Sequence, residues 1–132
     1  MKPKSVLVID DDRPMVNLIA AIVMSQGHQP TTSSDVVTGL SGFRPGLYDL
    51  VISDIFMEGA GGIEGIKQIR QIDPAVPIIA VSAGYNDMAP EKAVMAAEKI
   101  GANYGVAKPF TPEDMAQLIN QALGQSSEEK PE

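Results

Sequence analysis

Short apolar runs alternate with segments of helical periodicity along the whole of this chain. The run from Val6 to Ile9 is continuous and rich in β-branched residues, which is typical of a strand buried on both faces. Apolar runs predict strands at residues 6–9, 49–53, 76–82 and 103–107, and residues 29–32 are interpreted as a further short strand. Apolar residues at helical spacing predict helices at residues 14–26, 35–43, 63–72, 91–100 and 112–123. Five strands alternating with five helices predict an α/β fold, a parallel sheet with helices on both faces and right-handed crossovers.

Length and composition narrow the class of protein. With 132 residues and 44% hydrophobic residues, we expect one folded domain at residues 1–124 and a polar, acidic, disordered tail at 125–132. The net charge of −7 argues against binding to nucleic acid or an anionic membrane through the general field of the domain. The absence of cysteine excludes disulfides and thiolate metal sites. No apolar stretch is long enough to span a membrane, so we expect a cytoplasmic protein.

Polar side chains follow four of the predicted strands where each strand ends. Asp10 and Asp11 follow the first, Asp54 the third, Ser82 the fourth and Lys108 the fifth. Because parallel strands end at one edge of a sheet, where ligands bind in open α/β folds, we expect these groups to lie together. Clustered carboxylates favour a hard cation, Mg²⁺ or Mn²⁺, and lysine and serine beside it suit phosphoryl oxygens. The pattern predicts a site where a phosphoryl group is placed on a carboxylate.

Each of these signals has a simpler structural interpretation when taken alone. The aspartate run could be a charged turn in which Asp12 caps the first helix, Lys108 could belong to a solvated turn, and Ser82 could cap a helix. His28 is interpreted as a surface loop residue rather than a metal ligand, because the chain has no second histidine. The joint placement after four different strands favours a functional site.

These residues lie within motifs that resemble the receiver domain of two-component response regulators, of the single-domain chemotaxis type. The resemblance covers residues 5–123. It rests on Val8 to Asp12, Asp49 to Asp54, Met57 and Gly62 at the family's offsets from the acceptor, Pro77 to Ala83, Gly101-Ala102, and Lys108 to Phe110. The resemblance implies a flavodoxin-like sheet with strand order 2-1-3-4-5.

The resemblance also implies roles for the residues of the site. Asp54 would accept the phosphoryl group, and Mg²⁺ would be held by Asp11, Asp54 and the backbone carbonyl of Phe56, with Asp10 holding a metal-bound water. Ser82 and Lys108 would contact the phosphoryl group. The donor would be a phosphohistidine on a sensor histidine kinase or a phosphotransfer protein, and phosphorylation would change binding to an unknown downstream protein. Such a protein is a signalling switch that assists its own phosphorylation and dephosphorylation rather than an enzyme.

The sequence departs from the family pattern in three places. Glu58 stands where the family usually has proline, and extra glycine follows it. The segment between Ser82 and Gly101 is about four residues longer than in the chemotaxis type, which implies an enlarged loop. Gly105 occupies the position of the family's frequent aromatic residue, while Tyr104 lies one place earlier. Since strand side chains alternate between faces, Tyr104 is expected to point to the opposite side of the sheet.

Other classes of protein remain as alternatives. A haloacid-dehalogenase-like phosphohydrolase would use Asp10 and Asp12 as its Asp-x-Asp pair, but it needs a further acidic pair on a strand after Lys108. A flavin-binding module would need a phosphate loop after the first strand, where this chain has three acids. A degenerate receiver acting only as a binding module is disfavoured because all five polar positions are present.

Overall fold

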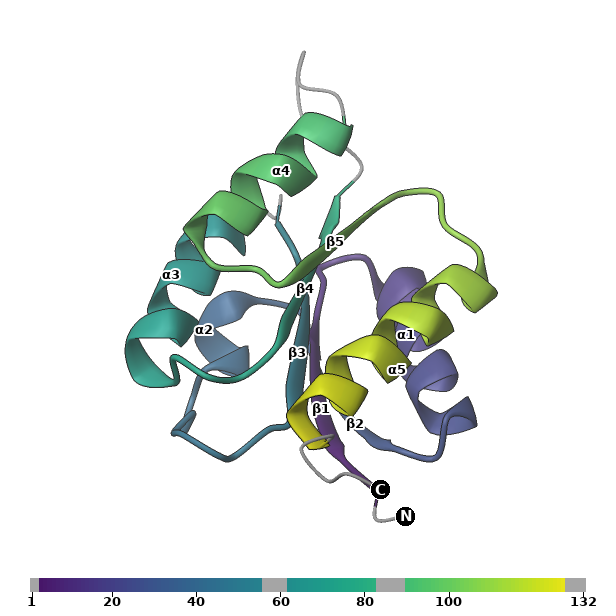
Figure 1. Ribbon diagram of the computed structural model, residues 1–132, viewed down its shortest axis with the longest axis horizontal. Helices are drawn as coiled ribbons and strands as arrows, with labels where there is room; N and C mark the ends of the chain where they lie inside the picture. The colour runs from purple at the N-terminus through teal and green to yellow at the C-terminus, as the bar shows by residue number, and fades with distance from the viewer. Residues whose placement is uncertain (1–2, 56–61, 83–89, 128–132) are drawn as a thin grey trace.

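Five parallel strands form one sheet, and helices cover both of its faces (Figure 1). The computed structural model describes residues 3–55, 62–82 and 90–127. The strands are β1 (Ser5–Ile9), β2 (Gln29–Ser33), β3 (Leu50–Asp54), β4 (Ile78–Ser82) and β5 (Tyr104–Ala107), in the order β2-β1-β3-β4-β5. The helices are α1 (Arg13–Ser25), α2 (Val36–Gly39), α3 (Gly62–Ile72), α4 (Pro90–Ile100) and α5 (Pro112–Ser127). The α/β class and the strand order are therefore confirmed.

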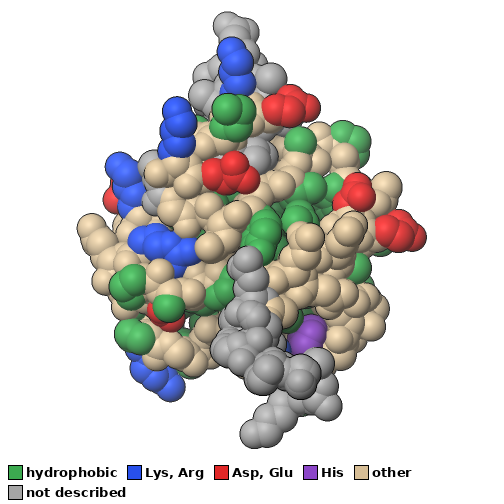
Figure 2. All heavy atoms as spheres, in the orientation of Figure 1, with side chains coloured by type: hydrophobic (Ala, Val, Ile, Leu, Met, Phe, Trp, Pro, Cys, Tyr) green, Lys and Arg blue, Asp and Glu red, His purple; other side chains and the backbone are tan. Residues whose placement is uncertain are grey.

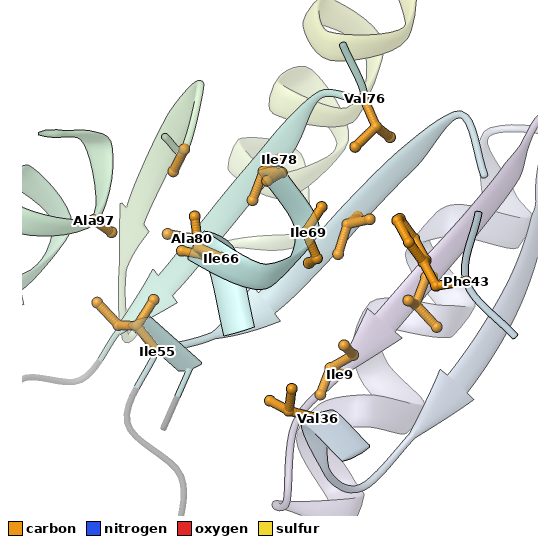
Figure 3. Packing of buried hydrophobic residues seen from close by; sticks show 13 residues of the cluster. Ile9, Val36, Phe43, Ile55, Ile66, Ile69, Val76, Ile78, Ala80 and Ala97 are labelled. Carbon is orange, nitrogen blue, oxygen red and sulfur yellow. The ribbon is translucent and has the colours of Figure 1, made fainter. Parts of the chain in front are cut away.

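Two apolar cores lie on the two faces of the sheet. One packs side chains of α1 and α5, such as Ile19 and Ile119, against β1, β3 and β4. The other, drawn in Figure 3, packs α2, α3 and α4 against the opposite face, with Ile66 and Ile69 of α3 fully buried. Because both faces are covered, the residues of β3 and β4 are buried throughout, which explains their continuous apolar runs.

Local hydrogen bonds fix where the long helices begin. The Asp12 carboxylate accepts the N–H of Met15 at 3.4 Å and caps α1, with Pro14 in the first turn. At α5, the N–H of Asp114 donates to the Thr111 hydroxyl at 3.0 Å, and the Asp114 carboxylate accepts the N–H of Thr111 at 3.4 Å. The α5 helix continues to Ser127, three residues into the stretch for which a tail was expected.

The second helix is shorter than its sequence suggested. It was expected to reach Phe43, but α2 has four residues and ends at Gly39. A Cβ at Gly39 would lie 2.9 Å from the Ile9 side chain, so the backbone approaches β1 closely there. Gly42 has φ +75°, which turns the chain away from a helical path, and Phe43 then stacks on Tyr48 with ring centroids 5.9 Å apart.

Polar side chains fasten the amino-terminal edge of the sheet. The guanidinium of Arg70 donates to three backbone carbonyls, those of Asp73, Val76 and Gly101, and to the Asn103 side chain at 2.7 Å. The buried carboxylate of Asp73 accepts three backbone N–H groups, from residues 46, 75 and 76. The end of α3, the start of β4 and the turn before β5 are thereby joined.

The interpretation of His28 as a surface residue is wrong. The side chain is 7% exposed, and its Nδ1 accepts the backbone N–H of Lys4 at 3.0 Å, where β1 begins. Burial lowers the pKa of His28, the nearby charge of Lys4 lowers it further, and Asp49 opposes the change. A neutral imidazole is the form that accepts this hydrogen bond.

Within the described ranges, no helix has both the length and the apolar character needed to cross a membrane.

Candidate functional site

Three carboxylates meet at the carboxyl-terminal edge of the sheet. Asp54 is the last residue of β3, and Asp10 directly follows β1. The parallel register pairs Ile9 with Ser53, which brings the next residue of each strand, Asp10 and Asp54, side by side. Asp11 follows Asp10, and ligand oxygens of all three acids lie within 4.8 Å of one another. The strand pairing itself therefore concentrates the negative charge.

Asp10 is held from two sides and lies almost entirely below the surface. It is 1% exposed, and its Oδ1 accepts the backbone N–H of Asp12 at 2.9 Å. Its Oδ2 lies 3.4 Å from Nζ of Lys108. These contacts fix the direction of the carboxylate before any ligand arrives.

Lys108 connects the fifth strand with the acid cluster. Its Nζ lies 3.5 Å from Oδ2 of Asp54 as well as 3.4 Å from Asp10, so one ammonium group serves two buried carboxylates. Both distances exceed the 2.7–2.9 Å of a strong charge-assisted hydrogen bond. The lysine backbone N–H donates to the carbonyl of Ser82 at 2.7 Å, which fastens the end of β5 to the end of β4.

Ser82 lies at the same edge, at the end of β4. It is fully buried, and the register places it opposite Ala107, directly before Lys108. The structure therefore brings Asp10, Asp11, Asp54, Ser82 and Lys108 to one edge, as the strand ends predicted. The carbonyl of Phe56 lies outside the described residues.

The donor set suits a hard divalent cation. All three clustered side chains offer oxygen, and neither the sulfur nor the imidazole that softer metals prefer is present in the cluster. Like charges at this separation repel, and a cation between them would relieve that repulsion. Asp10, Asp11 and Asp54 are thus the residues that would hold Mg²⁺.

A hollow beside the acids was not anticipated from the sequence. It has a volume of about 250 Å³ and opens on the β2 side of Asp10 and Asp11. Polar side chains from α1 and from the end of β2 line it, among them Arg13, Asn17 and Ser33. Arg13 and Asn17 are four residues apart at the start of α1, so they share one face of that helix. This spacing is the feature of the sequence that could have indicated the polar lining.

The fifth strand lacks an aromatic side chain on the face toward α4. Tyr104 packs with the core formed by α1 and α5. Gly105 pairs with Ala80, which belongs to the core on the α4 side. The predicted orientation of Tyr104 is therefore confirmed.

Comparison with known proteins gives consistent matches over nearly the whole chain. Residues 6–120 match the family model for the response regulator receiver domain. The chemotaxis protein CheY of Thermotoga maritima is 32% identical over 121 residues, which cover 89% of this chain and 95% of that protein. The uncharacterized transcriptional regulatory protein YkoG of Bacillus subtilis is 29% identical over 96% of this chain, but the match covers 54% of that protein.

Solved structures agree with the sequence matches. The response regulator receiver domain protein from Clostridium thermocellum superimposes with a TM-score of 0.81 at 28% identity, covering 93% of this chain and 96% of that one. The chain spans about half the length, or less, of the first transcriptional regulators that it matches. The acid cluster, the strand order and these matches lead to one conclusion: this chain belongs to the response regulator receiver domain family.

Proposed function

We propose that this chain, with its receiver unit at residues 1–124, accepts a phosphoryl group on Asp54. Receiver domains interact with histidine kinases or phosphotransfer proteins and with downstream targets. The observation that carries the proposal is the placement of Lys108 between two buried carboxylates of a three-acid cluster. The donor would be a phosphohistidine on such a kinase or phosphotransfer protein, and both proteins would act in the cytoplasm.

In the proposed reaction, a carboxylate oxygen of Asp54 attacks phosphorus, and the bond from phosphorus to the donor nitrogen breaks. The imidazole of the donor leaves with the electron pair. Lys108 then pairs with an oxygen of the transferred group, and the hydroxyl of Ser82 donates to another. Positioning and charge stabilisation supply most of the catalysis in phosphoryl transfer, which fits an edge where backbone contacts fix these side chains.

A divalent cation bound by Asp11 and Asp54, with Asp10 holding a metal-bound water, would neutralise charge on the phosphoryl oxygens and reduce repulsion between the acids and the donor. Such added positive charge fits a site in which Lys108 lies beside a cluster of three acids. The carbonyl of Phe56 remains a predicted further ligand. We therefore propose that phosphorylation requires Mg²⁺ or Mn²⁺.

The contacts of Asp10 favour Asp54 over Asp10 as the nucleophile. A dehalogenase-like hydrolase would use the acid after the first strand. Asp10 is 1% exposed and its Oδ1 accepts a backbone N–H, whereas Lys108 lies at similar distances from Asp10 and Asp54 and does not distinguish them. Asp54 is somewhat more exposed, at 6%, and ends the central strand.

Incubation with acetyl phosphate and Mg²⁺, followed by intact-mass measurement, tests the acceptor. We expect the mass to rise by one phosphoryl group in the wild type and not in Asp54→Ala. Asp12→Asn is the matched control. Asp12 follows Asp10 and Asp11 in the sequence, but its carboxylate caps α1. It should label like the wild type, and labelling of Asp54→Ala would overturn the assignment.

Substitution of Asp11 tests the cation requirement. Asp11→Ala removes an exposed carboxylate of the three-acid cluster, so Mg²⁺ binding by titration calorimetry should be abolished. Full phosphorylation of the wild type in excess EDTA would contradict the requirement.

We propose that the signal leaves the site through Ser82, into residues 83–90 and the start of α4, without an aromatic rotation. Residues 83–89 lie outside those described. The support is that Gly105 has no side chain to rotate and that Tyr104 packs on the other face. A phosphoryl group that biases a two-state segment is a known switching mode. NMR of free and beryllofluoride-bound protein tests it, and inward movement of Tyr104 with an unchanged 83–90 segment would refute it.

A further inference from the structure

The hollow beside the acid cluster shares two walls with the site of the proposed reaction. Asp10 and Asp11 line the hollow, and ligand oxygens of both acids lie within 4.8 Å of an oxygen of Asp54. The volume of about 250 Å³ is below the roughly 300–1,000 Å³ of pockets that hold drug-sized ligands. A ligand that reaches from the acid cluster into the hollow is therefore a small molecule.

The α1 side of the hollow offers a cation, an amide and an apolar surface. Arg13 is exposed, and it alone is positively charged among the described residues that line the hollow. Asn17 is exposed one helical turn further along α1, and the buried Val16 supplies an apolar wall. On the β2 side, the hydroxyl of Ser33 already donates to the carbonyl of Asp35 at 2.8 Å. A ligand would thus meet two nitrogen donors on α1.

This set of groups matches a small carboxylate. A guanidinium presents its N–H donors as a planar fork that fits the two oxygens of a carboxylate. An amide N–H can donate to the same oxygens, and an apolar wall suits a short alkyl chain. A second phosphate would bring more negative charge close to Asp11 than a carboxylate does, so the singly charged group fits better.

The strand order places the hollow on the side from which a leaving group departs. In phosphoryl transfer, the attacking and leaving atoms lie roughly in line through phosphorus. Asp54 attacks from the end of β3, and the order β2-β1-β3 puts the β2 side of the acid cluster opposite to it. A leaving group that extends away from Asp54 across β1 therefore reaches the hollow beside Arg13.

We propose that the hollow is a subsite for the carboxylate that leaves a small acyl phosphate, and that Arg13 gives the protein a preference for such donors over phosphoramidates. The inference rests on the proposed function, phosphorylation of Asp54. In this step an oxygen of Asp54 bonds to phosphorus, the bond from phosphorus to the acyl oxygen breaks, and the carboxylate leaves with the electron pair. No proton has to be supplied, and the guanidinium stabilises the charge that develops on the leaving oxygen.

Phosphoramidate provides the contrast, because its leaving group is neutral ammonia and has no oxygen for Arg13 to bind. A role of Arg13 in general attraction would affect both anionic donors alike. On the face drawn in Figure 2, basic side chains gather over α3 and α4, whereas Arg13 lies at the start of α1. The ratio of the two labelling rates therefore separates a contact with the leaving group from a general field.

The test measures the rate of labelling by acetyl phosphate and by phosphoramidate, each with Mg²⁺, from intact mass. Arg13→Gln should label about tenfold more slowly with acetyl phosphate and within about twofold of the wild type with phosphoramidate. Arg13→Lys keeps the charge without the fork and should recover only part of the acetyl phosphate rate. Arg44→Gln, the same change at another exposed arginine, should leave both rates within about twofold.

Binding of the leaving group gives a second readout that does not depend on turnover. Sodium acetate added to the unphosphorylated protein with Mg²⁺ should shift the side-chain NMR signals of Arg13 and Asn17, and should leave the Arg44 signal in place. Sodium chloride at the same concentration is the control for ionic strength, and it should shift neither side chain of the hollow.

Three results would overturn the subsite while leaving the proposed function intact: equal slowing of Arg13→Gln with both donors, unchanged labelling of that variant, or no shift at Arg13 with acetate. In each case the wild type would still be labelled at Asp54. A wild type that neither donor labels would overturn both the subsite and the proposed function.

Discussion

The two edges of the sheet use similar polar residues in different ways. At the amino-terminal edge, Arg70 and Asp73 direct their polar atoms at backbone groups, with hydrogen bonds of 2.6–3.2 Å. At the carboxyl-terminal edge, Oδ1 of Asp10 also accepts a backbone N–H, but Oδ2 of Asp10 and Oδ2 of Asp54 both lie beside Lys108, at 3.4 and 3.5 Å, within a cluster of three acids. The first arrangement stabilises the fold. In the second, the clustered carboxylates repel one another, and a bound ligand would relieve that repulsion.

Removing Arg70 should have the largest effect on stability. Arg70→Ala breaks hydrogen bonds to three carbonyls and to Asn103, and leaves partly buried acceptors without this donor. We expect the free energy of unfolding in urea to fall by about 2–3 kcal/mol. Arg44→Ala, at an exposed arginine, should change it by less than about 0.5 kcal/mol. Equal losses in the two variants would show that the Arg70 contacts do not stabilise the fold.

Two buried aspartates, one at each edge, provide a matched pair. Asp73 is 7% exposed and Asp54 is 6% exposed. Asp73→Ala leaves three backbone N–H groups without their acceptor and should cost about 2 kcal/mol. Asp54→Ala removes one of three clustered acids and should cost less than about 1 kcal/mol, although we expect it to abolish phosphorylation. A larger loss at Asp54 than at Asp73 would reverse the comparison.

The sequence predicted the carboxyl-terminal edge better than the amino-terminal one. Asp10, Asp54 and Lys108 each follow an apolar run, so the strand pattern alone placed them together. Two of the Arg70 contacts, with Gly101 and Asn103, and the contact of the buried His28 with Lys4 join residues that are 24 or more positions apart. No local pattern predicts which distant backbone group will meet such a side chain.

The early end of the α2 helix was missed for a related reason. Its capping oxygen at Asp35 was visible in the sequence and does accept the N–H of Thr38 at 2.6 Å. Its end depends on the close approach of Gly39 to Ile9 in β1, which is a tertiary contact. The residues after Asp54 and after Ser82 that depart from the family pattern fall outside the described ranges.

Lys108 should affect signalling more than stability or metal binding. Lys108→Ala removes the ammonium group between two carboxylates but none of the three clustered acids. We expect Mg²⁺ affinity to stay within about threefold of the wild type, and the NMR differences between free and beryllofluoride-bound protein to shrink. A variant that responds as fully as the wild type would count against this role.

Acidification should produce the smallest effect, through His28. Because its pKa is lowered in the fold, the unfolded chain takes up the proton first as the pH falls below about 6.5. The stability from neutral His28 is present above that pH and is lost as the pH falls through the folded pKa. Urea unfolding at pH 7.5 and pH 5.5 should show a larger loss in the wild type than in His28→Asn, whose amide can still accept the Lys4 N–H. Identical losses would show that His28 does not contribute.

The position of the phosphoryl group tests the central claim most directly. Protein treated with acetyl phosphate and Mg²⁺ can be reduced with borohydride, which converts a phosphorylated aspartate to homoserine, and then mapped by peptide mass spectrometry. The account predicts homoserine at position 54 alone, and none when EDTA is present. Homoserine at position 10, or labelling that does not depend on the cation, would contradict it.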